Sequence, residues 1–68
     1  MYVLQLFYRH GSQVRLTNED PTVLVDSGVQ SQAQGLIFAW RVVNTGSGKC
    51  WDYWKEGEKD NERAYELR

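Results

Sequence analysis

Basic and apolar side chains alternate along the predicted strands of this chain. The basic residues of these strands all occupy odd-numbered positions: Arg9, Arg15, Arg41, Lys49 and Lys55. Apolar residues fall mostly on even numbers: Tyr2, Leu4, Leu6, Tyr8, Val14, Leu16, Leu36, Phe38, Trp40, Val42, Cys50 and Trp54. Successive side chains of a strand point to opposite faces, so the alternation predicts a sheet with an apolar inner face and a basic outer face. Three aromatic residues are also expected on the outer face: Phe7, Trp51 and Tyr53.

The first predicted hairpin joins residues 2–8 to residues 13–17. A loop over residues 10–12 pairs Leu6 with Leu16 and keeps the apolar side chains of both strands on one face. A slip of one residue would mix the two faces, and such a slip is costly where one face is buried. We therefore expect this register.

The second predicted hairpin joins residues 36–43 to residues 49–55 around the polar loop 44–48. The first of these strands is apolar on both faces except at Arg41, which is typical of a central strand. A five-residue loop places Arg41 opposite Trp51, where a cation–π pair can form. Trp40, at the centre of the inner face, is expected to be buried, whereas Trp51 is expected to be accessible.

The segment between the hairpins is compatible with two structures. Residues 22–25 are rich in β-branched side chains, which favour a strand. Ser27 and Gln30 form a capping-box pattern, and Gly35 is placed as a C-terminal stop, which together favour a helical segment within residues 21–34, with 28–34 as the preferred stretch. The helix gives a two-layer α+β domain with a four-stranded antiparallel sheet. If the segment is a strand, the alternative is a small all-β barrel.

Length and composition limit the organisation of the protein. With 68 residues, one cysteine and one histidine, the chain has no internal disulfide and no four-ligand zinc site. We expect one compact domain over residues 1–56 and a polar, acidic C-terminal segment over residues 57–68 that is able to move. Residues 1–8 lack the length and the basic lead of a signal peptide or membrane span, and the single cysteine favours a reducing compartment. We therefore expect a complete, cytoplasmic reading frame.

No motif in the chain fixes a catalytic activity. Residues 46–49 resemble a phosphate-binding loop but lack its first glycine and its final Ser or Thr. Cys50 is expected to point inward beside Val42 as an inert thiol. His10 lies in a turn, and the acidic residues after 55 lack the spacing of a calcium loop. We therefore expect no enzymatic activity, no cofactor and no metal.

The outer face is the remaining candidate for function. Tryptophan, tyrosine and arginine are enriched at binding hot spots, and this face combines such residues with lysine. The expected binding residues are Arg9, Arg15, Arg41, Lys49, Trp51, Tyr53 and Lys55. They predict a module that binds another protein, for example as an inhibitor or adaptor of a larger enzyme. Short reading frames that carry no recognisable functional motif are typical of accessory proteins from phages and mobile elements.

Two other kinds of partner fit the same sequence. Aromatic and basic side chains together also bind single-stranded nucleic acid, although the formal net charge of −1 gives no overall attraction to it. Self-association into a homodimer is a third possibility, because the predicted edge strands have few proline or lysine residues. The sequence predicts no membrane partner.

Overall fold

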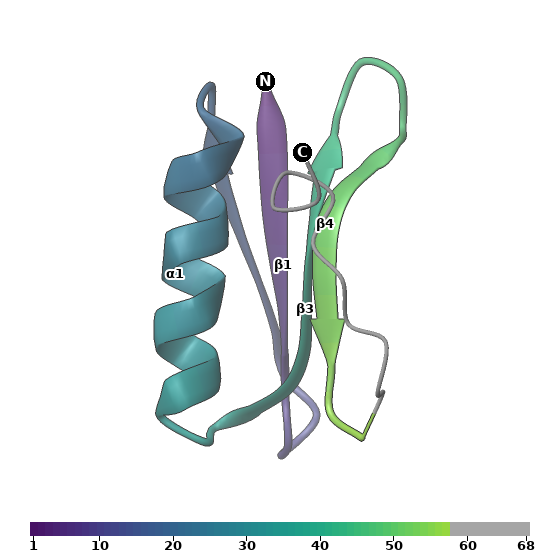
Figure 1. The fold of residues 1–68 in the computed structure, drawn as a ribbon. Helices are drawn as coiled ribbons and strands as arrows, with labels where there is room; N and C mark the ends of the chain where they lie inside the picture. Colours follow the sequence, from purple (N-terminus) through teal and green to yellow (C-terminus); the bar gives the residue numbers. More distant parts are fainter. Residues whose placement is uncertain (58–68) are drawn as a thin grey trace.

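The protein is an open four-stranded antiparallel sheet with one helix across one face (Figure 1), as seen in a computed structural model that describes residues 1–57. The elements in chain order are β1 (Tyr2–Tyr8), β2 (Gln13–Asn18), α1 (Pro21–Ala33), β3 (Ile37–Asn44) and β4 (Cys50–Lys55). The order of strands across the sheet is β2-β1-β3-β4. The predicted α+β domain is confirmed. The all-β barrel is wrong, because residues 22–25 are helical and the sheet is open.

The helix lies within the predicted range 21–34, but it begins before the preferred stretch 28–34. Asp20 caps the N-terminus: its Oδ1 accepts hydrogen bonds from the Thr22 backbone N–H at 3.0 Å and from the Thr22 hydroxyl at 2.7 Å. Pro21 follows at the first helical position, where its missing N–H costs nothing. Ser27, the predicted cap, lies within α1 and donates to the Val23 carbonyl oxygen. Gly35 is confirmed as the stop, with a φ of +75°.

The core lies between α1 and the two central strands. Its buried members are Leu4, Leu6, Leu24, Val25, Ile37, Trp40 and Val42. Trp40 is 1% exposed, as predicted, and its indole Nε1–H donates to Gln32 Oε1 of α1 at 3.0 Å. Leu24 and Val25 show why the β-branched stretch is helical, since in α1 both are buried in the core. Burial against the sheet outweighs their local preference for a strand.

Both hairpins are offset by two residues from the predicted register. Leu6 pairs with Val14 instead of Leu16. In the second hairpin, Arg41 pairs with Tyr53 instead of Trp51. An offset of two residues does not by itself change the face of any side chain, so the face pattern alone cannot distinguish the two registers; the faces change only at two bulges.

A bulge in β3 reverses the predicted orientation of Phe38. Phe7 pairs with Ala39, whereas Tyr8 pairs with Ile37, so Phe38 is the extra residue of β3. Ile37 is therefore buried in the core, and Phe38 is exposed. The prediction that Phe38 faces inward is wrong, because a bulge shifts the alternation of side chains by one residue.

A second bulge, in β4, reverses the predictions for Trp51 and Cys50. Val42 pairs with Asp52 and Val43 pairs with Cys50, which leaves Trp51 as the extra residue. Trp51 packs against the core, and its ring meets the Tyr2 ring edge-on with centroids 5.8 Å apart. Cys50 is exposed instead of pointing inward beside Val42.

The expected C-terminal segment 57–68, apart from Gly57, lies outside the described residues. Within residues 1–57, no helix has the length and apolarity needed to cross a bilayer.

Candidate binding face

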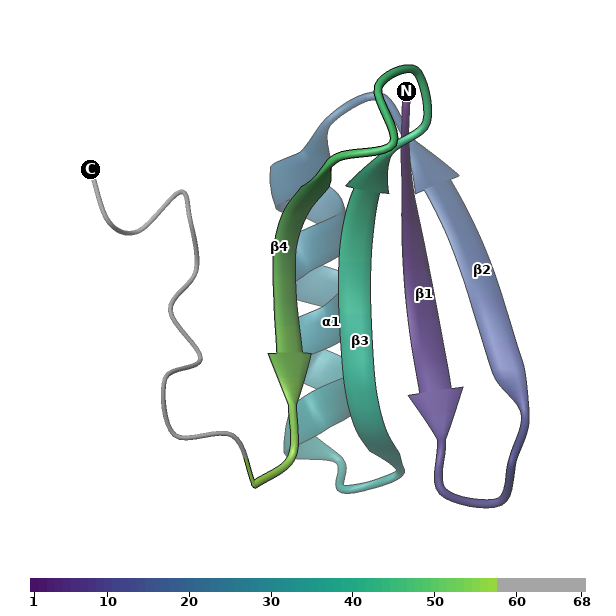
Figure 2. The same cartoon turned by 90° about the vertical axis from the view of Figure 1, so that its right-hand side faces the viewer.

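The face of the sheet opposite α1 carries an aromatic and basic patch. In Figure 2 the sheet lies in front of α1, so this outer face is turned toward the reader. We define the outer patch as Gln5, Phe7, Phe38, Arg41 and Tyr53. These residues come from three adjacent strands, β1, β3 and β4, and so lie next to one another across the middle of the sheet.

Two phenylalanines form the apolar part of the outer patch. The ring centroids of Phe7 and Phe38 lie 6.3 Å apart, with the ring planes inclined by 46°. Phe38 is 39% exposed. This separation is typical of interacting aromatic pairs. The bulge in β3 thus moves an aromatic ring from the core side of the sheet to the outer patch, and bulges often re-aim a side chain in this way next to functional sites.

Arg41 is held in position at the centre of the outer patch. Its guanidinium carbon lies 5.9 Å from the centroid of the Phe7 ring, within cation–π range. Its Nε–H donates a hydrogen bond to Gln5 Oε1. Across the sheet, Arg41 pairs with Tyr53 and not with Trp51, because the register differs from the predicted one. Gln5 and Phe7 therefore restrict the conformations that Arg41 can adopt.

Every charged side chain at an outward position of the four strands is a cation. These residues are Arg15 of β2, Arg41 of β3 and Lys55 of β4. Asp52, the acidic residue of the strands, is buried at an inward position, where its Oδ1 accepts a hydrogen bond from the Tyr53 N–H. The outer face of the strands is consequently suited to an anionic partner.

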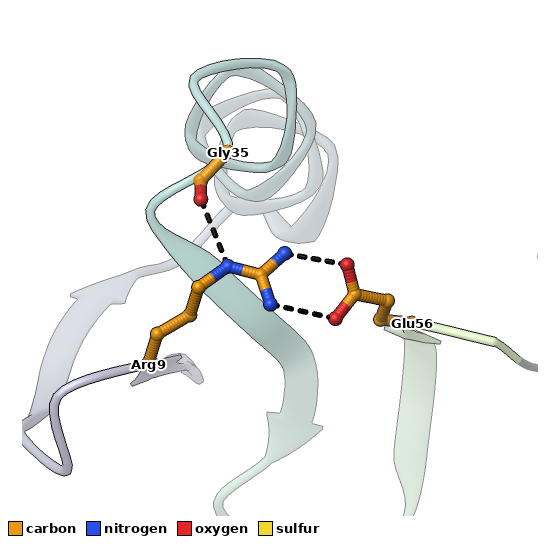
Figure 3. Close-up of polar contacts among 3 residues, drawn as sticks. All are labelled: Arg9, Gly35 and Glu56. Atoms are coloured by element: carbon orange, nitrogen blue, oxygen red, sulfur yellow. Dashed lines mark hydrogen bonds and ion pairs between the residues drawn. The ribbon is translucent and has the colours of Figure 1, made fainter.

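Arg15 and Lys55 lie on the outer face of the strands but outside the outer patch, and three more of the predicted binding residues do not lie on that face. Trp51 is on the core side of the sheet. Lys49 is in the loop that precedes β4. Arg9 lies in the turn after β1, where its guanidinium forms a bidentate ion pair with Glu56 and its Nε–H donates to the Gly35 carbonyl oxygen at 3.0 Å (Figure 3).

The contacts of Arg9 give it a structural role at one end of the sheet. They join the β1–β2 turn to the connection between α1 and β3 and to the residue that follows β4. The hydrogen bonds from Arg9 lower the pKa of the Glu56 carboxyl group, and the same contact raises the pKa of Arg9. Both partners stay ionised at neutral pH.

The thiol of Cys50 is not activated as a nucleophile. Partial burial raises the pKa of the Cys50 thiol, the charge of Asp52 raises it further, and the charge of Arg41 opposes both. Cys50 is therefore protonated at neutral pH, whereas thiol chemistry needs the thiolate. The ring Nε2 of His10 lies 2.7 Å from the Ser12 hydroxyl within the β1–β2 turn. Within residues 1–57, no three His, Cys, Asp or Glu side chains are grouped to hold a metal ion.

The structure adds Gln5 and Phe38 to the residues that the sequence indicates. Gln5 has no sequence signal beyond its odd number. Phe38 has no sequence signal for the outer face, because it stands in an apolar run, residues 36–40, that shows no alternation.

No protein-family model, curated protein or solved structure matches the chain.

Proposed function

We propose that the protein is a small, non-enzymatic module that binds another protein through the outer patch. The observation that carries this proposal is the exposed Phe38 ring beside Phe7, with Arg41 held over Phe7. A chain of 68 residues has few aromatic side chains available for its core. Exposed apolar groups that cluster, unlike scattered ones, mark interaction surfaces.

The arrangement of the patch favours a protein partner with an apolar surface beside carboxylates. Phe38 supplies apolar area, which contributes roughly 25 cal/mol per Å² when it is removed from water. Arg41 supplies a guanidinium that can bind a carboxylate through two hydrogen bonds. Because Gln5 and Phe7 already order Arg41, binding requires less loss of side-chain freedom, a cost of about 0.5–1.5 kcal/mol for a mobile side chain. An inhibitor or adaptor of a larger enzyme would use such a surface.

Capture of partners from a cell lysate tests the proposal. We expect Phe38→Ala and Arg41→Ala each to reduce recovery of a specific partner at least tenfold, which is the size of a hot-spot effect. Leu36→Ala and Lys49→Ala are the matched controls, since Leu36 and Lys49 are exposed but lie outside the outer patch. Unchanged recovery with both patch variants would exclude the outer patch as the binding surface.

Single-stranded nucleic acid is the second candidate partner, and the purely cationic charge of the outward strand positions favours it. Bases could stack on Phe7 and Phe38 while Arg15, Arg41 and Lys55 follow the phosphates. Such stacking is worth roughly 1–3 kcal/mol per base, and the binding weakens steeply with salt. Titration of a labelled oligonucleotide at two salt concentrations separates the candidates: salt-sensitive binding lost in Phe38→Ala supports nucleic acid, and no binding at low salt removes it.

A further inference from the structure

The edge strand β2 directs one side of its backbone away from the sheet. The Tyr8 N–H donates to the Ser12 carbonyl oxygen at 2.9 Å, so residues 8 and 12 form a hydrogen-bonded pair. Hydrogen-bonded and non-hydrogen-bonded pairs alternate along an antiparallel ladder. Even-numbered residues of β2 therefore bond to β1, and three odd-numbered residues direct their N–H and C=O groups outward: Gln13, Arg15 and Thr17. All six residues of β2 are exposed.

Apolar side chains flank this edge on the helix side of the sheet. Val14 and Leu16 of β2 are 36% and 43% exposed. Val23 of α1 is 46% exposed. α1 packs mainly against β3 and β1. In Figure 2 the helix does not lie behind β2, so the apolar face of β2 is partly uncovered.

We propose that β2 pairs in antiparallel fashion with β2 of a second copy of this chain, so that two sheets join into one of eight strands. Outward N–H and C=O groups without a bulge, proline or lysine form a template for another strand. Two-fold symmetry requires the strand to be complementary to itself. The sequence of β2 meets this requirement better in a register centred on Leu16 than in one centred on Arg15.

The favoured register places Leu16 on the two-fold axis. Leu16 then lies opposite Leu16 of the second copy, and Arg15 lies opposite the second copy's Thr17, with Glu19 of that copy next along the chain. This arrangement covers the two Leu16 side chains with each other and places Arg15 near the Glu19 carboxylate of the second copy. A register centred on Arg15 places two cations directly opposite each other, which is destabilising.

The other edge strand is less suited to pairing. β4 is interrupted by the bulge at Trp51 and ends in Lys55. Bulges and lysine residues are devices that discourage pairing at a sheet edge. In a dimer through β2, the axis is perpendicular to the sheet, so both helices lie on one face and both outer patches on the other. The dimer would therefore present two copies of the outer patch on the same side, yet its formation does not depend on what the patch binds.

Sedimentation equilibrium of the full chain over a wide concentration range tests the dimer. We expect a mass that rises from that of one chain, 7.9 kDa, to twice that value. Thr17→Pro removes an outward N–H without removing a bond to β1, and it should weaken association roughly tenfold or more. Thr17→Ala is the matched control and should associate like the wild type. Leu16→Lys provides an independent block, because a charge would then face the apolar contact.

Two outcomes of sedimentation would overturn the proposal: a single-chain mass at every concentration, or a dimer that persists in both Thr17→Pro and Leu16→Lys. Circular dichroism of each variant shows whether the fold is retained. Phe38→Ala should show the same masses in sedimentation as the wild type, because Phe38 lies away from β2. Loss of partner capture and loss of dimer formation can therefore be observed independently.

Oxidative cross-linking tests the register. In a Cys50→Ser background, Leu16→Cys should form a covalent dimer, because non-hydrogen-bonded partners have Cα atoms about 4.5 Å apart, within disulfide range. Val14→Cys is the control: the two copies of residue 14 are separated by four residues along the strand, roughly 13 Å. Faster cross-linking through residue 14 than through residue 16 would contradict the Leu16-centred register.

Discussion

Gly28 of α1 lies directly against the indole ring of Trp40 in β3. A Cβ atom on Gly28 would be 2.7 Å from Trp40 Cδ2, closer than non-bonded carbon atoms pack, and 3.0 Å from Trp40 Cε2, which is also a tight contact. The absence of a side chain at residue 28 therefore sets the distance between the helix and the sheet. The same close approach allows Gln32, one turn further along α1, to accept the hydrogen bond from the Trp40 indole.

We expect Gly28→Ala to destabilise the protein. In an unconstrained helix this change is stabilising, by roughly 0.5–1 kcal/mol. Here the added methyl group must displace Trp40 or lift α1, and overpacking of this kind costs about 1–3 kcal/mol. Urea denaturation measures the difference, with Asp26→Ala as the control at an exposed position of the same helix. A variant as stable as the wild type would show that the helix adjusts without cost.

Trp40→Ala is expected to leave the chain largely unfolded. Truncation of a buried aromatic side chain costs roughly 3–5 kcal/mol, which is as large as the total stability of a domain of this size, about 3–5 kcal/mol. Phe38→Ala, two residues away in the same strand, should cost only about 0.5–1.5 kcal/mol, because its ring is on the outer face and mainly loses its contact with Phe7. Circular dichroism and thermal melting compare the two variants, and similar melting temperatures would contradict the bulge at Phe38.

Trp51→Ala should reduce stability and leave partner capture unchanged. The ring packs on the core beside Tyr2 and does not reach the outer patch. The loss in stability should be smaller than for Trp40→Ala, because Trp51 is half-buried. Denaturation and partner capture with the same variant test both statements. A fully stable variant that has lost its partner would instead place Trp51 at the binding surface.

The ion pair between Arg9 and Glu56 should make stability depend on pH in the acid range. Arg9 lowers the pKa of Glu56 in the folded protein. The resulting stabilisation is complete above the pKa of Glu56 in the unfolded chain, about 4.3, and is lost as the pH falls through the lower folded value. Urea denaturation of the wild type and of Glu56→Gln from pH 7 to pH 3 measures this effect, and the wild type's advantage should shrink as the pH falls.

The comparison with Glu56→Gln also cancels the contribution of a second carboxyl group, that of Asp20, to the pH dependence of stability. The Thr22 hydroxyl and backbone N–H lower the pKa of Asp20, so the wild type and the variant share that loss at low pH. A constant difference between the two proteins at every pH would mean that the Glu56 charge does not stabilise the fold. Because both side chains are exposed, added salt should also reduce the difference.

Cys50 should react slowly with alkylating reagents at neutral pH although it is exposed. Partial burial and Asp52 raise the pKa of its thiol, and so reduce the thiolate fraction. Arg41 acts in the opposite direction, so Arg41→Ala should slow the reaction further. Iodoacetamide labelling followed by mass spectrometry measures both rates against a short cysteine peptide. A rate above that of the peptide would contradict the raised pKa.

The outer patch was predictable in part. The odd positions of Phe7, Arg41 and Tyr53 place them on the outer face, and the structure brings them together. The same rule fails at Phe38 and Trp51, because each is the extra residue of a bulge. Arg9 obeys the rule in its number, yet it lies beyond the end of β1, where Glu56 and Gly35 bind it.

The sequence by itself determined the features that depend on neighbouring residues. These are the alternation in β1 and β2, the inward position of Trp40 in an apolar strand, and the stop at Gly35. The tertiary structure decided the start of α1, the two-residue offsets and both bulges. A bulge in β3 depends on how that strand pairs with β1, about thirty residues earlier in the chain, and residues 36–40 are apolar on both faces. Local patterning cannot indicate such an insertion, because every register of an unpatterned apolar strand buries similar side chains until the partner strand is in place.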